Sequence, residues 1–373
     1  MIGALKRAYA NFRGFDEAGS TVPMMDGPLK PNTLLDGGEI LLSLPQVDNL
    51  VSTAGGLVCS SGAELLALNW PDRAMPLAVA QRRAFEAPIT CLASDGGKGL
   101  AIGLDGRGLL IQGGRHDGRR IDALQDRPLN CPTAALFLDA DTLVVANGSA
   151  DNNAEAWKRD LMGRFASGSV WRIDLSTGPG AGAKMLARGL AFPCGIAAGD
   201  DGALLVSEAW RHQLIGLDPA RGGQSKRLLG DLPAYPGRIL HAADGGFWIA
   251  LFAPRNQLVE FVLRETGYRR RMMERIDPAY WIAPSLAGGA SYLEPIQGGA
   301  RKKLNIMKPW APTWSYGLVL RCDRAMRPVT SLHSRADGHV HGVTAIAEAD
   351  GRLLIAAKGS GAIVGLTLSE GQA

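Results

Sequence analysis

The stretch FPCGIAAGDDGALLVSEAWRHQLIGLD, from Phe192 to Asp218, decides the fold. It reads as a proline, a short apolar run, an Asp-Gly turn, a second apolar run, another break and a third apolar run. Apolar runs of about four to eight residues between such turns are typical of short antiparallel strands. A cysteine, Cys194, directly follows the proline.

The same pattern recurs along the chain. Aligned on the proline or its equivalent, similar segments begin at Leu44, Ala87, Cys131, Phe192, Tyr235 and His341. Their spacings are 43, 44, 61, 43 and 106 residues, so one unit is repeated with two insertions. A strand-rich repeat of this length is typical of a propeller blade. The sequence therefore predicts an all-β fold, a six-bladed β-propeller.

Each unit continues with two further runs of strand length. The second runs are 100–104, 142–147, 203–208, 247–252 and 352–357, and the third runs are 108–112, 169–174, 213–218, 257–262 and 362–367. A weaker outer strand completes each blade. The segment 38–44, GEILLSL, is predicted to supply the outer strand of the last blade, which would close the ring and leave no bare edges there.

The predicted propeller runs from residue 37 to residue 373, and an N-terminal segment, 1–36, is expected to pack on it. The insertion 150–165 resembles a helix. The insertion 264–316, between blades five and six, is helical and aromatic, with Tyr280, Trp281, Tyr292, Trp310 and Trp314. Long inserts in compact domains are often functional, so this one is either a lid over a pocket or a hydrophobic clasp between blades.

Composition narrows the functional classes. The net charge is +4, and the lysines and arginines are scattered, which disfavours nucleic acid as a partner. The 5 cysteines include no CxxC pair, so reduced thiols and a cytoplasmic location are expected. No apolar run approaches the roughly 20 residues of a membrane span. A small-molecule ligand is the expected partner.

Several quoted segments carry a family resemblance. SGSVWRIDLSTG (167–178), the opening stretch and LPAYPGRILHAADGGFWIAL (232–251) stand in an order that resembles the strictosidine-synthase-like proteins. These belong to a wider group that includes gluconolactonases and SMP-30. The resemblance extends from about residue 130 to residue 368. It implies a propeller whose central channel holds the functional site.

The resemblance also implies where a metal would lie. In the metal-dependent members, oxygen side chains directly after the repeat's proline help to hold a calcium-like ion. Here those positions are Thr133, Cys194 and Gly237. A hard divalent cation needs about six to eight oxygen ligands, and Asp48 nearby does not restore them. We expect no metal and no other cofactor, as in the strictosidine synthase branch, whose catalytic glutamate would fall at Thr344.

Residues that follow each proline are expected to line the channel mouth. The candidates for substrate binding are Gln46, Thr133, Arg238, His339 and Thr344, with Trp281 from the second insertion. Arg238 has a forked guanidinium suited to a carboxylate or phosphate. The alternative is that it bonds carbonyls of neighbouring loops.

The catalytic candidates are His341, Glu208 and Cys194. His341 is a candidate general base, and Glu208 either moves a proton or forms an ion pair beside Arg211. Cys194 is either a nucleophile or a packing thiol.

Three functions stay open. One is a metal-independent hydrolase or lyase acting on a small organic molecule in the channel, with Arg238 anchoring the substrate. Another is a non-catalytic propeller that binds a small ligand or a protein. The third is a divalent-metal-dependent lactonase or esterase of the SMP-30 type. Convergence of Arg238, His341 and Glu208 on one pocket would favour an enzyme, and divergence would favour a binding protein.

Overall fold

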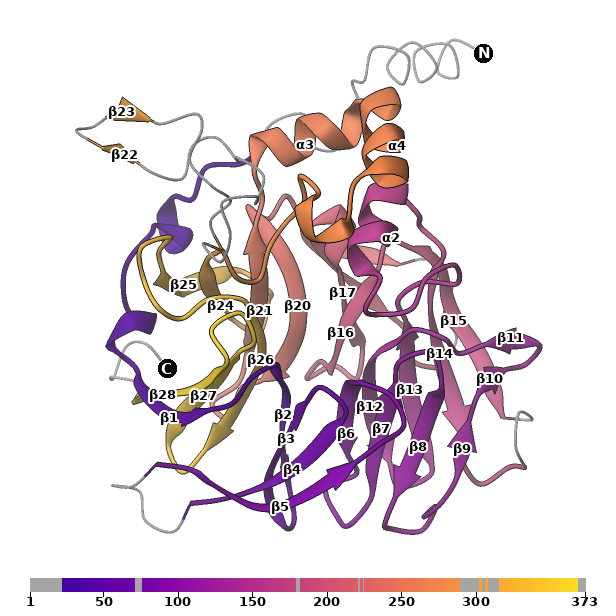
Figure 1. Ribbon diagram of the computed structural model, residues 1–373. Helices are drawn as coiled ribbons and strands as arrows, with labels where there is room; N and C mark the ends of the chain where they lie inside the picture. Colours follow the sequence, from indigo (N-terminus) through magenta and orange to yellow (C-terminus); the bar gives the residue numbers. More distant parts are fainter. Residues whose placement is uncertain are drawn as a thin grey trace.

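Six four-stranded antiparallel sheets follow one another around a ring in the computed structural model (Figure 1). The structure describes residues 22–70, 76–178, 182–220, 222–223, 225–288, 302–303, 306–307 and 315–367. The innermost strand of each sheet contacts the innermost strands of its two neighbours, and the last of them contacts the first. The predicted six-bladed β-propeller is therefore confirmed.

The blades follow the chain order. Blade 1 contains β2 (Val47–Thr53), β3 (Gly56–Ser61), β4 (Glu64–Asn69) and β5 (Ala78–Ala84). Blade 2 contains β6 (Ile89–Ser94), β7 (Leu100–Leu104), β8 (Gly108–Gln112) and β9 (Arg120–Ile121). Blade 3 contains β12 (Pro132–Asp139), β13 (Thr142–Asn147), β14 (Gly168–Asp174) and β15 (Ala183–Leu190).

The second half of the ring is built in the same way. Blade 4 contains β16 (Pro193–Ala198), β17 (Leu204–Glu208), β18 (Gln213–Leu217) and β19 (Lys226–Leu229). Blade 5 contains β20 (Ala234–His241), β21 (Phe247–Pro254), β24 (Gly317–Cys322) and β25 (Pro328–Ser334). Blade 6 contains β26 (Val343–Ala349), β27 (Arg352–Ala357), β28 (Ala362–Thr367) and β1 (Glu39–Ser43). Two short hairpins, β10 (Ala123–Leu124) with β11 (Arg127–Pro128) and β22 (Lys302–Lys303) with β23 (Ile306–Met307), lie outside the blades.

The ring closes through β1. This strand pairs antiparallel with β28, from Glu39 opposite Gly365 to Ser43 opposite Ala362. Leu41 on β1 is fully buried with residues of blades 1 and 6. The outer strand predicted for the segment 38–44 is confirmed, and it joins the first part of the propeller to the last.

One predicted strand is a helix. The segment 257–262 was expected as the third strand of blade 5, but it forms α3 (Gln257–Arg264), and β24 takes the place of that strand. The Asn256 side chain accepts a hydrogen bond from the Leu258 N–H and caps the helix. Val259, Val262 and Leu263 are the buried residues of α3 and have helical spacing. The short run QLVEFV fits a strand by length alone, so the strand prediction was wrong. The second insertion accordingly interrupts blade 5, between β21 and β24, and does not lie between blades 5 and 6 as predicted.

The helices gather at one end of the ring (Figure 1). α2 (Trp157–Gly163) lies within the insertion 150–165, and α4 (Thr266–Arg275) follows α3. Leu161 and Met162 of α2 pack in one buried cluster with residues of α3 and α4 and with Trp281. The 3₁₀ helices are η1 (Gly27–Leu29), η2 (Leu35–Gly37), η3 (Ala209–Arg211) and η4 (Pro278–Tyr280). None of the helices in the described ranges is long and apolar enough to cross a membrane.

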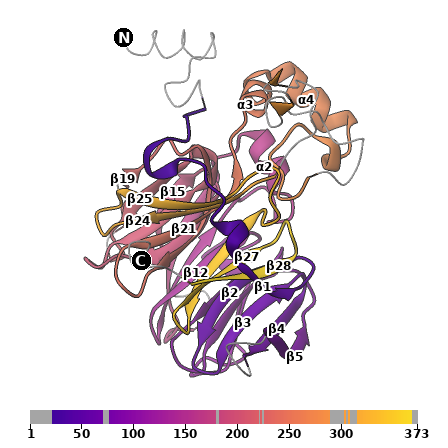
Figure 2. The ribbon, with the colours of Figure 1, turned by 90° about the vertical axis from the view of Figure 1, so that its left-hand side faces the viewer.

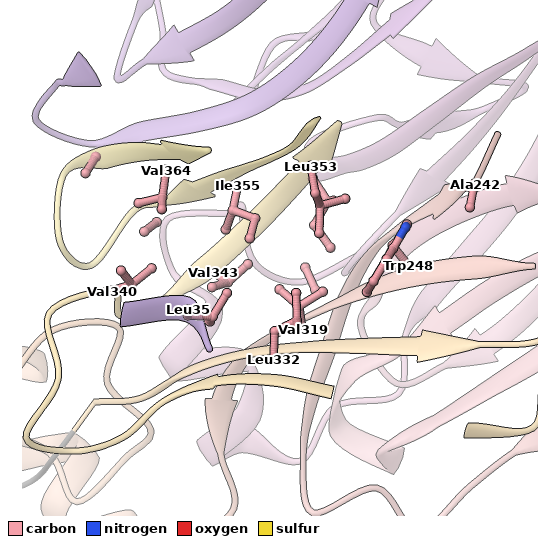
Figure 3. Close-up of a cluster of buried hydrophobic side chains, with 14 residues drawn as sticks. Leu35, Ala242, Trp248, Val319, Leu332, Val340, Val343, Leu353, Ile355 and Val364 are labelled. Carbon is pink, nitrogen blue, oxygen red and sulfur yellow. The ribbon is translucent and has the colours of Figure 1, made fainter. Parts of the chain in front are cut away.

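The N-terminal segment runs along blade 5 (Figure 2). The Asn32 side chain donates to the Ser331 carbonyl at 2.9 Å and accepts from the His333 N–H at 3.0 Å. Leu35 is fully buried between blades 5 and 6, where it meets Val340 and Leu332 (Figure 3). Residues 1–21, the first part of the segment expected to pack on the propeller, lie outside the described residues.

Candidate functional site

Each innermost strand carries one extra residue near one end of the channel. The pairing skips Thr90 on β6, Thr133 on β12, Cys194 on β16 and Thr344 on β26. On β20 the pair Gly237–Arg238 faces one residue, and on β2 the pair Asn49–Leu50 does so. Such β-bulges leave a residue unpaired and turn its side chain away from the sheet. Five of the six bulges place a residue in the lining of the same opening, and on blade 1 the lining residue is Asp48, next to the bulge.

A cavity of about 370 Å³ lies at this opening. Its floor includes five of the bulge residues, Thr90, Thr133, Cys194, Arg238 and Thr344. Gln46, Asp48, Glu155 and Lys358 add polar side chains, and Leu286 from the second insertion also belongs to the lining. The volume lies within the range of small-molecule sites. Gln46, Thr133, Arg238, Thr344 and Cys194 thus share one cavity, as the spacing after each proline suggested.

Arg238 spans the channel. Its Nη1 donates to Asp48 Oδ1 at 2.6 Å and to the Thr344 carbonyl at 2.8 Å. Its Nη2 donates to the Thr90 carbonyl at 2.7 Å. One guanidinium on blade 5 therefore joins blades 1, 2 and 6, which corresponds to the alternative of an arginine that bonds loop carbonyls.

Asp48 is held between two cations. Lys358 Nζ lies 3.0 Å from Asp48 Oδ2, on the opposite side from Arg238. Burial by itself would raise the pKa of Asp48, but the charges of Arg238 and Lys358 outweigh burial and hold this pKa well below its usual value. The carboxylate is therefore ionised, and the cluster Arg238–Asp48–Lys358 carries one net positive charge. Asp48 is a poor general base in this setting.

Three other bulge residues are engaged in structural hydrogen bonds between blades, whereas the Thr344 hydroxyl is buried without a partner among the described residues. The Thr90 hydroxyl donates to the Pro132 carbonyl, and the Thr133 hydroxyl donates to the Pro193 carbonyl at 2.5 Å. The Cys194 thiol lies 3.1 Å from the Pro236 carbonyl. Each of these bonds joins one blade to the next. Burial raises the pKa of Cys194 to about 11, so its thiol is protonated at neutral pH and is not an activated nucleophile.

One wall of the cavity is aromatic. It is formed by Trp157 of α2, Phe192, Trp210 and Phe252. The Phe192 and Trp210 rings stack with centroids 4.6 Å apart, and Trp157 stacks on Trp210 at 6.1 Å. Trp210 Nε1 donates to Asp160 on α2 at 2.8 Å, so Trp210 presents mainly ring surface to the cavity.

A buried carboxylate also positions the loop before α2. Asp105 on blade 2 accepts hydrogen bonds from the Ala154 N–H at 2.6 Å and the Glu155 N–H at 3.3 Å. This fixes the backbone that carries Glu155 and Trp157 to the cavity. The pKa of Asp105 is raised by burial, although these two hydrogen bonds oppose the shift.

Two of the predicted catalytic residues are not among the described residues that line the cavity. Glu208 is buried; its Oε1 accepts from the Ala191 N–H and pairs with Arg211, and its Oε2 accepts from Gln213. His341 Nδ1 contacts the Ser315 hydroxyl at 2.7 Å, and Nε2 contacts the Arg335 carbonyl at 2.8 Å. Arg238, His341 and Glu208 therefore do not converge on one pocket.

His339 and Trp281 also lie away from the cavity lining in the described structure. His339 Nδ1 is 3.3 Å from Asp36, near the N-terminal segment. Trp281 is buried against α3 and α4, and its Nε1 donates to the Ile276 carbonyl. Within the second insertion, Trp281 thus packs the helices onto blade 5, whereas Leu286 lines the cavity. Tyr292, Trp310 and Trp314 lie outside the described residues.

Several lining residues were missed from the sequence. Lys358 directly follows β27, the second strand of blade 6. Glu208, which was a candidate, ends β17, the second strand of blade 4. The end of the second strand was therefore a signal that could have identified Lys358. Glu155 and Trp157 belong to the insertion 150–165, which breaks the repeat and was a second signal. Phe252 and Trp210 have no pattern that separates them from core aromatics.

The residues at the channel mouth do not fit a divalent cation. Asp48 already pairs with two cations, and the hydroxyls of Thr90 and Thr133 and the thiol of Cys194 are directed at backbone carbonyls. No group of three or more His, Cys, Asp or Glu side chains suited to a metal occurs in the described part of the chain. A guanidinium and an ammonium provide the positive charge at this site.

Comparisons with known proteins agree with this architecture. The chain is 26% identical over 174 residues to strictosidine synthase-like 6 of Arabidopsis thaliana, covering 43% of this chain and 46% of that relative. The match therefore spans less than half of the relative's length. No protein-family model matches.

Solved structures show the same fold. A gluconolactonase from Xanthomonas campestris has a TM-score of 0.53 at 12% identity, with 88% of each chain covered. Regucalcin from Agrobacterium tumefaciens, a calcium-binding protein, has a TM-score of 0.50 at 12% identity, with 88% of this chain and 92% of that chain covered. The predicted resemblance to strictosidine-synthase-like and gluconolactonase-type propellers is confirmed for the fold.

Proposed function

We propose that this propeller binds a small organic molecule in the channel-mouth cavity and does so without a divalent metal. The observation that carries the proposal is the Arg238–Asp48–Lys358 cluster beneath a cavity with an aromatic wall. The fixed cations Arg238 and Lys358 provide the positive charge that a metal ion would otherwise provide. The cavity combines apolar walls with a few convergent polar groups, as small-molecule sites do.

The test is ligand binding by protein treated with a chelator. Native mass spectrometry of freshly isolated protein should detect a co-purified small molecule, and added Ca²⁺, Mg²⁺ or Zn²⁺ should leave the melting temperature unchanged. The variant Glu155→Trp places an indole at an exposed position of the mouth and should abolish ligand binding. Asp151→Trp, an exposed residue of the same insertion outside the described cavity lining, is the matched control.

Two results would contradict the proposal. One is a large, saturable stabilisation by a divalent ion, which would restore the metal-dependent lactonase or esterase alternative. The other is ligand binding that Glu155→Trp and Asp151→Trp leave equally strong. The first result concerns the metal, and the second concerns the location of the site.

Turnover of the ligand by a hydrolase or lyase reaction is the second candidate function. Glu155 and Lys358 line the same cavity, so a carboxylate and an ammonium face one ligand from different elements. Arg238 and Lys358 would stabilise negative charge that develops on a substrate oxygen. A panel of aryl esters and lactones tests this function, and the activity should fall at least about 100-fold in Glu155→Gln if that carboxylate transfers the proton.

A comparison of wild type with Glu155→Gln distinguishes the binding function from the catalytic function. Glu155→Gln is close in size to glutamate, so ligand binding should survive this substitution even where turnover is lost. Binding without turnover in both wild type and Glu155→Gln would identify a non-catalytic propeller.

A further inference from the structure

The polar groups that remain for a ligand are few, and they define its chemistry. The hydroxyls of Thr90 and Thr133 and the thiol of Cys194 all point to backbone carbonyls of the next blade. Arg238 directs three hydrogen bonds to Asp48 and two carbonyls. Among the lining hydroxyls, that of Thr344 is left without a partner in the described structure, so a sugar-like ligand with many hydroxyls would find few partners.

Lys358 is the donor with capacity to spare. An ammonium group has three donors, and in the described part of the chain Lys358 Nζ has one hydrogen-bond partner, Asp48. Its side chain is 36% exposed, whereas that of Asp48 is 11% exposed. The cation is thus reachable from the cavity, and the carboxylate that pairs with it lies deeper.

The charge of the floor favours an anion. Asp48 is shared by Arg238 and Lys358, so among the buried lining groups one positive charge is not balanced. The buried Asp105 carboxylate accepts from the Ala154 and Glu155 N–H groups and lies outside the described lining. Glu155 is the other carboxylate among the described lining residues, but it is exposed, where water and salt screen its charge. An anionic group on the ligand would complete the balance beside Lys358.

Another part of the lining is aromatic and apolar. Trp157 and Trp210 stack with an interplanar angle of 27°, and Phe252 meets Trp157 edge-on at 5.9 Å. The Trp210 N–H is already bonded to Asp160. Aromatic surfaces of this kind take planar rings by offset stacking or edge contact.

Resting on the proposed function, we propose that the ligand class is an aromatic carboxylate, with its carboxylate on Lys358 and its ring system against Trp157, Trp210 and Phe252. The cavity of about 370 Å³ suits a molecule with one or two fused rings. The carboxylate of such a ligand matches the unbalanced positive charge, and its ring system matches the aromatic wall. A ligand of this class also needs few partners for hydroxyl groups, and the cavity offers few.

Four probes of matched size test the class by isothermal titration calorimetry in the presence of a chelator. They are 2-naphthoate, its methyl ester, the cation 2-(aminomethyl)naphthalene, and gluconate, a polyhydroxylated anion. We expect 2-naphthoate to bind and the other three to bind at least about 10-fold more weakly. Equal or tighter binding of the ester or the amine would overturn the role of the charge.

Variants of the lysine locate the carboxylate. Lys358→Met keeps the length of the side chain and should weaken 2-naphthoate roughly 10- to 100-fold while leaving the methyl ester unchanged. Lys358→Arg should restore most of the affinity. Lys98→Met, an exposed lysine on blade 2 outside the lining of this cavity, should bind as wild type does. Far-ultraviolet circular dichroism and melting curves verify that each variant is folded.

The outcomes separate the ligand class from the site. Binding of gluconate but not 2-naphthoate, blocked by Glu155→Trp, would refute the aromatic class and leave the cavity as the binding site. Binding of 2-naphthoate that Lys358→Met does not weaken would refute the carboxylate contact. Binding that Glu155→Trp does not affect would refute the proposed function itself.

Discussion

The contacts of Arg238 change the role that the sequence suggested for this residue. Its position two residues after the repeat's proline suggested a substrate anchor, and it does line the cavity. Its guanidinium, however, is directed at Asp48 and at the carbonyls of Thr90 and Thr344. Arg238 therefore holds four blades at the channel mouth and sets the charge that Lys358 presents to a ligand.

Removing this guanidinium should destabilise the protein. Arg238→Met leaves Asp48 with one cation and leaves two carbonyls without their donor, which should lower the free energy of unfolding by roughly 2–4 kcal/mol. Urea titration measures the change. Arg82→Met removes an exposed pair with Glu64 and should cost less than about 1 kcal/mol. Equal effects of the two variants would show that the Arg238 cluster adds little to stability.

The sequence predicted which residues line the cavity better than it predicted their hydrogen-bond partners. Counting from the proline placed Thr133, Cys194 and Arg238 in one cavity. The hydrogen bonds of these residues depend on the neighbouring blade, because each acceptor is a carbonyl about 42 to 106 residues away. The sequence also made His341 and Glu208 catalytic candidates, and in the structure both are bonded elsewhere.

At the scale of single elements, α2 is the element that shapes the cavity most directly. It carries Trp157 into the wall and Asp160 into the interior, where the carboxylate accepts from Trp210 and Asn152. Burial raises the pKa of Asp160, and its hydrogen bonds only partly oppose this. A short helix is thus fastened to the propeller by a buried, ionisable group.

The raised pKa of Asp160 predicts how stability depends on pH. The native state holds this proton more tightly than the unfolded chain does, so the contribution of Asp160 is full below about pH 4 and is lost as pH rises through the raised native value. Asp160→Asn removes the titration and keeps an oxygen for the Trp210 N–H. We expect this variant to gain stability relative to wild type between about pH 4 and about pH 7.

Urea unfolding at the two pH values measures the difference, with Asp126→Asn as the control. Asp126 is an exposed turn residue between β10 and β11 whose charge is not among those that shift the pKa of Asp160, and its substitution should leave the pH dependence as in wild type. A loss of relative stability by Asp160→Asn as pH rises would contradict the assigned cause.

Helices were harder to predict than strands in this chain. The repeat gave the strands, because turns and apolar runs recur at a fixed spacing. α3 interrupts the repeat with a run as short as a strand, and only the Asn256 cap and the spacing of Val259, Val262 and Leu263 distinguish it. These features are local, whereas the prediction followed the repeat, which required a third strand in this blade.

At the scale of the whole molecule, the ring is held closed by β1. This strand comes from the beginning of the described chain, yet it completes the sheet formed by β26, β27 and β28. Leu41 is fully buried in the cluster that links blades 6 and 1. The closure therefore depends on packing as well as on the backbone ladder.

Truncation of Leu41 should open this junction. Leu41→Ala should lower the free energy of unfolding by about 2–5 kcal/mol, because the deleted methyl groups leave a cavity between two blades. Ile40→Ala on the same strand is the matched control, since Ile40 is 49% exposed and should cost less than about 1 kcal/mol. Hydrogen exchange should show faster opening of β1 and β28 in Leu41→Ala alone. Global destabilisation of equal size in both variants would argue against closure through this strand.

The bulges on the innermost strands differ in how freely their residues can vary. A residue in a bulge has no partner across the ladder, so changing its side chain leaves the register of the sheet intact. Thr90, Thr133 and Cys194, however, also bond the next blade, and Arg238 joins four blades at the channel mouth. The hydroxyl of Thr344 has no partner among the described residues, so Thr344 is the bulge position at which the chemistry of the opening can be exchanged with the least effect on the ring.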